Sequence, residues 1–260
     1  MRRLWNLLPP LVTLGLILGA WHLATGPTGL PSYLLPGPAQ VGRALWGGFA
    51  DGSFWPHIGF TLTSTLVGYA IGSVGAVLTG ICVAESRLFE RFVYPYIVAI
   101  QAAPKVALAP LILVWFGFGL ASKVVLVALI CFFPLLVNTI IGIRAADREL
   151  IEMARSFSRS PVFIFLHVKL PAAAPAILGG LQIGIVLALI GAVVGEFVAS
   201  DRGVGYLIGS ATVNMNVSVM FAGVIILSVI GMAGSSIVQA LQRRIIFWQA
   251  DRSAPPPSET

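Results

Sequence analysis

The chain has 260 residues, of which 57% are hydrophobic and only 10% charged, and its mean hydropathy is +0.93. A soluble domain carries about 25% charged residues, so this composition excludes a soluble globular protein and indicates one solvated by lipid. The net charge of +6 comes from short basic clusters between apolar runs. Such clusters are typical of membrane topology signals and do not indicate nucleic-acid binding.

Apolar runs long enough to cross a bilayer, about 20 residues each, predict an all-α integral membrane protein with six transmembrane helices. The runs cover about residues 7–24, 58–84, 92–120, 124–143, 174–195 and 211–242. The first run follows Arg2 and Arg3, and no small-residue cleavage site closes it, which favours a retained helix over a signal peptide.

The segment between the first two spans, residues 26–57, begins rich in proline and glycine. It then becomes weakly amphipathic through Val41, Ala44, Leu45 and Phe49, a pattern that predicts a segment on the outer membrane face. We therefore divide the chain into an N-terminal helix with this segment (1–57), a core domain of five spans (58–248) and a disordered cytoplasmic tail (249–260).

The basic residues predict that both termini lie in the cytoplasm. With that orientation, nearly all of the 16 Lys and Arg residues lie on the cytoplasmic side, as the positive-inside rule requires. Only Arg43, Lys123 and Arg202 lie outside, and Lys105 lies within the membrane.

Small residues recur every four positions in two spans and predict close helix packing. The two stripes are Gly68, Gly72, Ala76 and Gly80, and Gly180, Gly184, Ala188 and Ala192. Such stripes serve either packing inside one chain or a seam between two copies, and the sequence leaves both open.

Two ionisable residues are candidates for polar groups in the membrane: Lys105 lies within the third predicted span, and Glu196 directly follows the fifth. Pro104 and Pro110 flank a break in the third span, and broken helices line cavities. We therefore assign Lys105, with Gln101 one turn before it, to the translocation pathway; the alternative is a lysine that snorkels or pairs structurally. Glu196 is expected near the outer face, at a gate, paired with Arg202, or as an interfacial carboxylate in water.

Motifs for catalysis and cofactor binding are absent from the sequence. No lysine follows a glycine, so there is no phosphate-binding loop. Cys82 and Cys131 lie in apolar runs, and the three histidines are far apart, so no metal or cofactor is expected. Two other functional classes of membrane protein are an intramembrane enzyme and an ion-coupled carrier. Both need several ionisable groups inside the membrane.

The loop 144–175 predicts a cytoplasmic helix-turn-helix. Asp147 can cap a first helix whose apolar face is Leu150, Met153, Ala154 and Phe157. Ser160 and Pro161 start a second helix, which Pro171 ends or kinks. So short an amphipathic helix needs a surface to bury against, either the membrane or another protein.

This loop resembles the EAA loop of binding-protein-dependent ABC importer permeases, whose pattern is E-A-A, three residues, G, nine residues, I-x-L-P. The matching residues are Glu152, Met153, Ala154, Ser158, Val168, Lys169, Leu170 and Pro171. The chain departs from the pattern at Met153, which replaces alanine, and at Ser158, which replaces glycine. A turn with positive φ is tolerated poorly by serine.

Further blocks from about residue 36 to 248 resemble the branch that carries sulfonates, taurine, nitrate, thiamine precursors and riboflavin. They are QAAPKVALAPL at 101–111, WFGFG at 115–119, FP at 133–134, NT at 138–139, VGEF at 194–197 and GVGYL at 203–207.

The resemblance implies a type I ABC importer permease in a bacterial inner membrane. It also implies a second permease copy, cytoplasmic ATPase subunits that hydrolyse the ATP, and an extracytoplasmic solute-binding protein. The loop would dock on the ATPase, with Glu152 meeting a basic group there; the alternative is that Glu152 pairs only with Arg148 or Arg155.

Overall fold

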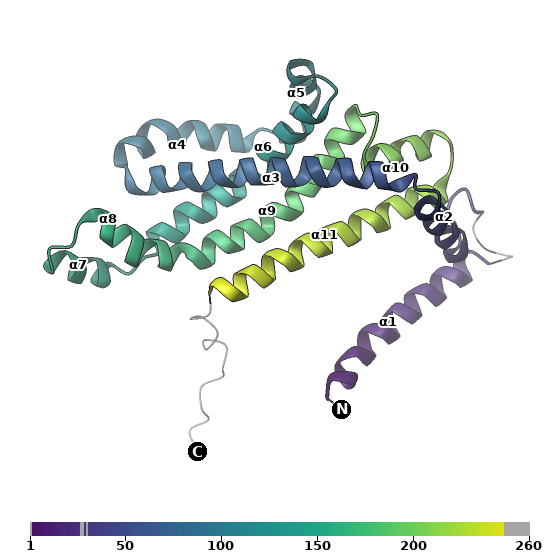
Figure 1. The fold of residues 1–260 in the computed structure, drawn as a ribbon, viewed down its shortest axis with the longest axis horizontal. Coiled ribbons are helices and arrows are strands. Elements are labelled where there is room, and N and C mark those ends of the chain that lie inside the picture. Colours follow the sequence, from purple (N-terminus) through teal and green to yellow (C-terminus); the bar gives the residue numbers. More distant parts are fainter. Residues whose placement is uncertain (1, 27–28, 30, 247–260) are drawn as a thin grey trace.

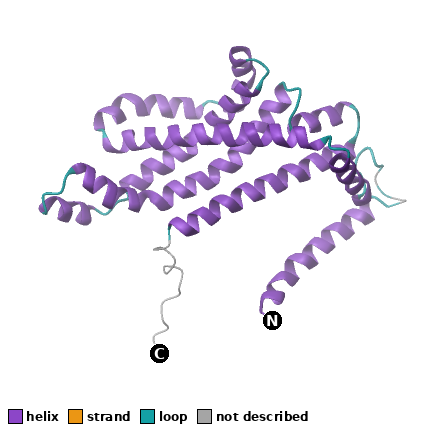
Figure 2. Cartoon of the chain, viewed as in Figure 1, coloured by secondary structure: helices purple, strands orange, loops and turns teal. Residues whose placement is uncertain are grey.

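The computed structural model describes residues 2–26, 29 and 31–246, and these residues fold into helices joined by short loops (Figure 1, Figure 2). The elements in chain order are α1 (Arg2–Ala24), α2 (Pro38–Ala50), α3 (Phe54–Glu85), α4 (Arg87–Ala102), the 3₁₀ turn η1 (Lys105–Leu108), α5 (Ala109–Phe116), α6 (Leu120–Arg144), α7 (Arg148–Ser156), α8 (Pro161–Ile164), the π-helical turn η2 (Phe165–Lys169), α9 (Leu170–Val198), α10 (Val204–Val213) and α11 (Val217–Ile245).

Four helices are long and apolar enough to cross a membrane: α3, α6, the continuous helix Pro161–Val198, and α11. The pair formed by α4 and the segment Lys105–Phe116 gives a fifth candidate, bent by 88°. The apolar part of α1, Leu11–Ala24, is shorter. The all-helical membrane fold is therefore confirmed, but the predicted count of six spans is not.

The predicted break in the third span is present between α4 and η1. Ala103, the residue before Pro104, is extended with φ −68° and ψ 140°, and α4 ends there. The proline ring disfavours helical geometry at the preceding residue and supplies no N–H. The chain therefore turns sharply at Pro104, and Pro110 lies in the first turn of α5, which projects from the bundle (Figure 1).

The predicted last span, 211–242, was wrong at its start. α10 ends at Val213, Met215 has φ 55°, and the Asn216 side chain caps α11 by accepting a hydrogen bond from the Val219 N–H. The predicted run was defined by its lack of charged residues, and that criterion does not detect an uncharged polar cap such as Asn216. The turn therefore divides the run into two helices.

The helix α6 is the centre of the bundle, because it packs along both α3 and α9. A Cβ added at Gly72 would lie 2.6 Å from Cys131 Sγ, and one added at Gly180 would lie 2.9 Å from Asn138 Cβ. Both small-residue stripes are thus filled by α6 of the same chain. This finding favours packing inside the chain over a seam between copies.

The amphipathic face predicted for the segment after α1 is present in α2. Val41 is buried, and Ala44 and Leu45 pack on a cluster formed by α10, α11 and the start of α3. The apolar face of α2 is therefore covered by protein, at the end of the bundle that carries α10 (Figure 1).

Of the two alternatives predicted for Pro171, that it ends or that it kinks the second helix of the loop, the first was wrong. The chain runs as one 38-residue apolar helix from Pro161 to Val198, and Pro171 lies in the first turn of α9. In the π-helical turn before it, Leu170 N donates to Phe165 O, a hydrogen bond that spans five residues instead of the four of an α-helix. At 1.5 Å per residue this helix is about 57 Å long, so one end must project beyond a hydrocarbon core of about 30 Å.

We predict that Gly72→Ala lowers the free energy of unfolding by about 1–3 kcal/mol, because the new Cβ would lie 2.7 Å from the Ala128 carbonyl oxygen. The matched control is Gly59→Ala in the same helix, where nothing lies within 4 Å of the new Cβ. That variant should be unchanged or gain up to about 1 kcal/mol. Reversible unfolding in mixed micelles measures both, and equal effects would contradict the packing role of Gly72.

Candidate functional site

The α7–α8 loop is built by the two caps that the sequence predicts. Asp147 Oδ1 accepts a hydrogen bond from Glu149 N at 2.9 Å at the start of α7. Ser160 Oγ accepts one from Phe163 N at 3.2 Å at the start of α8, with Pro161 in the first turn. Each cap satisfies a backbone donor that the helix itself leaves free. Both predictions are confirmed.

Ser158 adopts the left-handed conformation that the glycine of the family pattern would favour. Its φ is 54°, and the turn is closed by hydrogen bonds from Ser158 N to Arg155 O at 2.8 Å and from Arg159 N to Ala154 O at 3.2 Å. This pair of bonds is a Schellman motif. The turn therefore forms with serine, at a conformational cost of about 1–2 kcal/mol.

The apolar face of α7 forms one wall of a groove of about 690 Å³. Leu150, Met153 and Phe157 are 48%, 54% and 72% exposed, whereas Ala154 is buried. The groove is lined by Leu150, Met153, Ala154, Phe157, Arg159, Phe163, His167, Val168, Pro171 and Ala172. Large apolar side chains that are exposed together mark an interaction surface.

The opposite wall of the groove is a stack of three side chains. The Arg159 guanidinium lies 4.8 Å from the centre of the Phe163 ring, which stacks on His167 with 4.1 Å between ring centres. The sequence indicated no role for His167. Its spacing of four residues from Phe163 is the signal that predicts the stack.

Glu152 is exposed on α7. Among the described residues, no ion pair joins it to Arg148 or Arg155. The alternative pairing within its own helix is therefore not observed, and the carboxylate is exposed.

Two ion pairs connect the flanks of the loop to the hairpin of α3 and α4. Lys169 Nζ lies 2.7 Å from Glu85 Oε1, and Arg144 lies 2.8 Å from Glu90 Oε1. Leu170, which begins α9, is partly buried beside the first of these pairs. The loop is thus fastened to the rest of the bundle at both its entry and its exit.

Lys105 lies at the elbow of the broken helix. Its Nζ donates to Gln101 O at 3.0 Å and lies 4.8 Å from the centre of the Phe133 ring. Phe133 is near the middle of the 25-residue α6, so the ammonium lies at mid-depth of the bundle. No ion pair to Lys105 is present among the described side chains.

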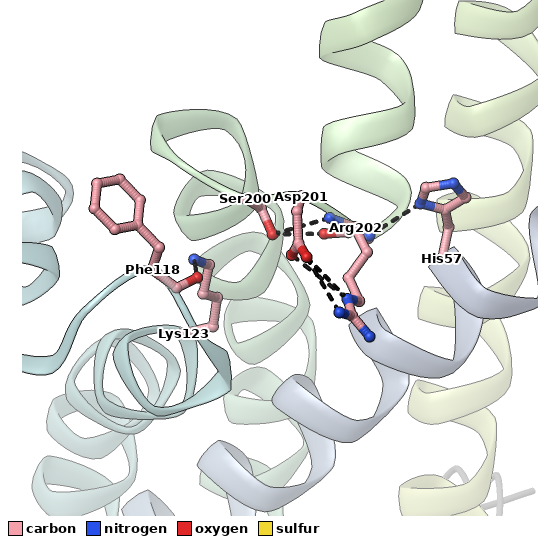
Figure 3. Close-up of polar contacts among 7 residues, drawn as sticks. His57, Phe118, Lys123, Ser200, Asp201 and Arg202 are labelled. Carbon is pink, nitrogen blue, oxygen red and sulfur yellow. Dashed lines mark hydrogen bonds and ion pairs between the residues drawn. The ribbon is translucent and has the colours of Figure 1, made fainter.

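Glu196 is 1% exposed, so the expected carboxylate in water is not what the structure contains. Its partners are Thr61 Oγ1 and Gly205 N, both at 2.8 Å, and Arg202 pairs instead with its neighbour Asp201 at 3.1 Å. The Arg202 guanidinium donates to Asp201 and holds the pKa of that exposed carboxyl below its usual value (Figure 3).

Three polar residues near Glu196 were not identified as functional from the sequence. Lys123 was expected outside but is 1% exposed. Its Nζ donates to the Phe118 carbonyl oxygen (Figure 3) and to that of Ala199. His57 and Thr61 lie one turn apart on α3 and face α10. That spacing within an apolar span is the signal that predicts a shared polar face.

Comparison with known proteins agrees with this geometry. Residues 72–247 match the family described as the binding-protein-dependent transport system inner membrane component. The chain is 38% identical over 246 residues to the riboflavin transport system permease protein RibX of Chloroflexus aurantiacus, covering 95% of this chain and 92% of that protein. It is 32% identical to the formylaminopyrimidine transport permease protein ThiX of Halalkalibacterium halodurans, covering 96% and 99%.

A further relative is the putative aliphatic sulfonates transport permease protein SsuC of Escherichia coli, which is 33% identical over 89% of this chain and 88% of that protein. Among solved structures, an inward-facing form of the MetNI methionine ABC transporter matches with a TM-score of 0.60 at 19% identity, over 74% of this chain and 94% of that one. The likeness to MetNI shows the fold. The chain belongs to the family of binding-protein-dependent transport inner membrane components and is an ABC transporter permease.

Proposed function

We propose that this permease is the membrane-spanning subunit of an ATP-driven importer in a bacterial inner membrane. A second copy completes the pathway, two cytoplasmic ATPase subunits supply the energy, and an extracytoplasmic protein delivers the solute. The observation that carries the proposal is the α7–α8 loop, which presents an apolar groove and an unpaired carboxylate beyond the ends of α3 and α6. ATP hydrolysis belongs to the partner subunit, so the permease is not itself an enzyme.

In this proposal the α7–α8 loop and both termini lie in the cytoplasm. Support comes from the basic residues around the loop, Arg144, Arg148, Arg155, Arg159 and Lys169, because positive charge favours the cytoplasmic side. The divisions of the chain follow the same plan: an N-terminal helix with α2, a core from 58 to 248, and a tail from 249, which lies outside the described residues.

The docking surface consists of Glu152, Met153, Ala154 and Ser158, with Leu170 and Pro171 at its base. The buried Ala154 lets the ATPase approach the helix closely, and Met153 and Phe157 supply apolar area. Ser158 fixes the angle between α7 and α8 through its left-handed turn. Glu152 meets a basic group of the ATPase.

The solute is a small organic or inorganic anion or a vitamin-precursor heterocycle. Riboflavin, aliphatic sulfonates and formylaminopyrimidine appear in the names of the relatives. Lys105, Gln101 and Glu196 are the residues we assign to the pathway. The position of the Lys105 ammonium supports this assignment, because it lies at mid-depth beside a broken helix and donates to one carbonyl oxygen, that of Gln101.

We predict that Glu152→Lys weakens association with the ATPase by about 30-fold or more, because breaking a charge pair at an interface costs about 2–5 kcal/mol. ATP hydrolysis should also lose its dependence on solute. The measurement is copurification of the two subunits, followed by uptake and ATPase assays in vesicles.

The matched control is Asp201→Lys, the same change in charge at the opposite end of the bundle, where the carboxylate is also exposed. It should leave ATPase association unchanged. Normal assembly and coupled uptake in Glu152→Lys would rule out the docking role of Glu152. Transport that proceeds with no ATPase present would instead favour an ion-coupled carrier.

We predict that Lys105→Met lowers the rate of solute uptake about tenfold, the equivalent of about 1.4 kcal/mol of lost charge-assisted interaction. Lys105→Arg keeps the positive charge and should retain more of the rate. Uptake of the solute released by the partner binding protein is the measurement, with complex assembly checked by size-exclusion chromatography. Unchanged uptake in an intact Lys105→Met complex would remove Lys105 from the pathway.

A further inference from the structure

The start of α10 is held by side chains from two other helices. α10 lies at the end of the bundle opposite α7 and α8 (Figure 1), and the first N–H groups of a helix have no partner within it. Here three such donors are satisfied from outside: Gly203 N donates to His57 Nδ1 at 3.1 Å, Val204 N to Thr61 Oγ1 at 2.8 Å, and Gly205 N to Glu196 Oε2 at 2.8 Å.

Glu196 is the centre of this arrangement. Thr61 Oγ1 donates to Glu196 Oε1 at 2.8 Å while it accepts from Val204 N, so α3, α9 and α10 meet at one carboxylate. The carboxylate is 1% exposed, and a buried charge without partners is costly. The positive end of the α10 dipole supplies a favourable partner. Glu196 and the start of α10 therefore hold each other in place.

Two glycines provide the space that the carboxylate occupies. Gly203 has φ 116°, and a Cβ there would lie 2.3 Å from the carboxyl carbon of Glu196. A Cβ at Gly205 would lie 2.9 Å from Glu196 Cβ and from the Val193 carbonyl oxygen. Any side chain at these positions would displace either the carboxylate or α10. The two glycines therefore leave the space that the buried Glu196 carboxylate needs.

Lys123 fastens the same end of the bundle from the other side. Its buried ammonium donates to the carbonyl oxygen of Phe118, before α6 (Figure 3), and to that of Ala199, at the end of α9. The turn from Ala199 to Gly203, which leads into α10, is therefore held at its first residue by Lys123 and at its last by His57. Between them, Ser200 is partly buried and Asp201 and Arg202 are exposed.

We propose that Glu196 is a positioning residue for transport: it anchors α10 across α3 and α9 and so keeps this end of the permease closed. The inference rests on the proposed function, in which this end faces the solute-binding protein. Opening toward that protein then requires α10 to leave the Glu196 carboxylate. Loss of the anchor opens the end without the binding protein.

The test places a cysteine probe under α10. Val204 is 0% exposed, and Val204→Cys is introduced with Cys82→Ser and Cys131→Ala into the complex of permease and ATPase in phospholipid nanodiscs, which leave both faces of the membrane accessible. The rate of labelling by a membrane-impermeant maleimide should rise about tenfold or more with Glu196→Ala, because hydrogen bonds to a charged group are lost. ATP hydrolysis without binding protein should rise with it.

Conservative and control variants separate positioning from general loosening. Glu196→Gln retains an acceptor for Gly205 N and should label close to the wild-type rate, and the nearby exposed Asp201→Ala should not change it. Thr61→Val removes two hydrogen bonds with little change in volume and should give an intermediate rate, which keeps the test available if Glu196→Ala does not fold. A second probe, Ala173→Cys, is also 0% exposed but lies near the start of α9, and its labelling should stay constant.

Unchanged labelling of Val204→Cys in both Glu196→Ala and Thr61→Val would overturn the proposal. An equal rise at Ala173→Cys would also overturn it, because that result indicates general unfolding. Copurification with the ATPase is scored separately. A complex that retains its ATPase but shows no change in labelling refutes the role of Glu196 and leaves the importer function intact, whereas a permease that never binds an ATPase refutes the importer function alone.

Discussion

Lipid offers helices no hydrophobic reason to associate, so this bundle depends on how closely the backbones of α3, α6 and α9 can approach. Glycines on α3 and α9 meet side chains and backbone of α6 at distances that leave no room for a Cβ. The close approach places α6 between its neighbours and buries half of its apolar stretch, against 17% for α11. The hydrogen bond between Thr61 on α3 and Glu196 on α9 joins two helices whose spacing these glycines set.

The two ends of the bundle differ in which groups they bury and which they expose. At the α10 end, Lys123 and Glu196 are removed from solvent, and each finds backbone or side-chain partners that offset its desolvation. At the α7–α8 end, large apolar side chains are left exposed and the ion pairs are partly solvated. A buried, fully bonded end is suited to holding one arrangement, and an exposed apolar end is suited to receiving a partner.

Much of the α7–α8 loop was predictable because its signals are local. Asp147 and Ser160 act on donors two or three residues away, and Pro104 acts on the residue before it. The same locality explains the break at the elbow. Family resemblance added the spacing from Glu152 to Pro171, which no physical rule on helices supplies.

The α10 end was predicted less well because its signals are distant in sequence. Thr61 and Glu196 are 135 positions apart, and nothing near either residue indicates the other. Lys123 and Glu196 were treated as residues near water, since hydropathy cannot tell a charge at a membrane face from one buried by a neighbouring turn. The boundary between α10 and α11 was missed because Asn216, its cap, carries no charge.

The helix from Pro161 to Val198 connects these two ends, and near its midpoint Gly180 packs against Leu135 and Asn138 of α6. It therefore has the geometry of a lever with a fulcrum at half its length. Rotation by about 10° about that point moves each end of a rod of about 57 Å by about 5 Å, in opposite directions. A displacement of the loop end by about one helical turn would therefore move the Glu196 end of the helix by a similar distance in the opposite direction.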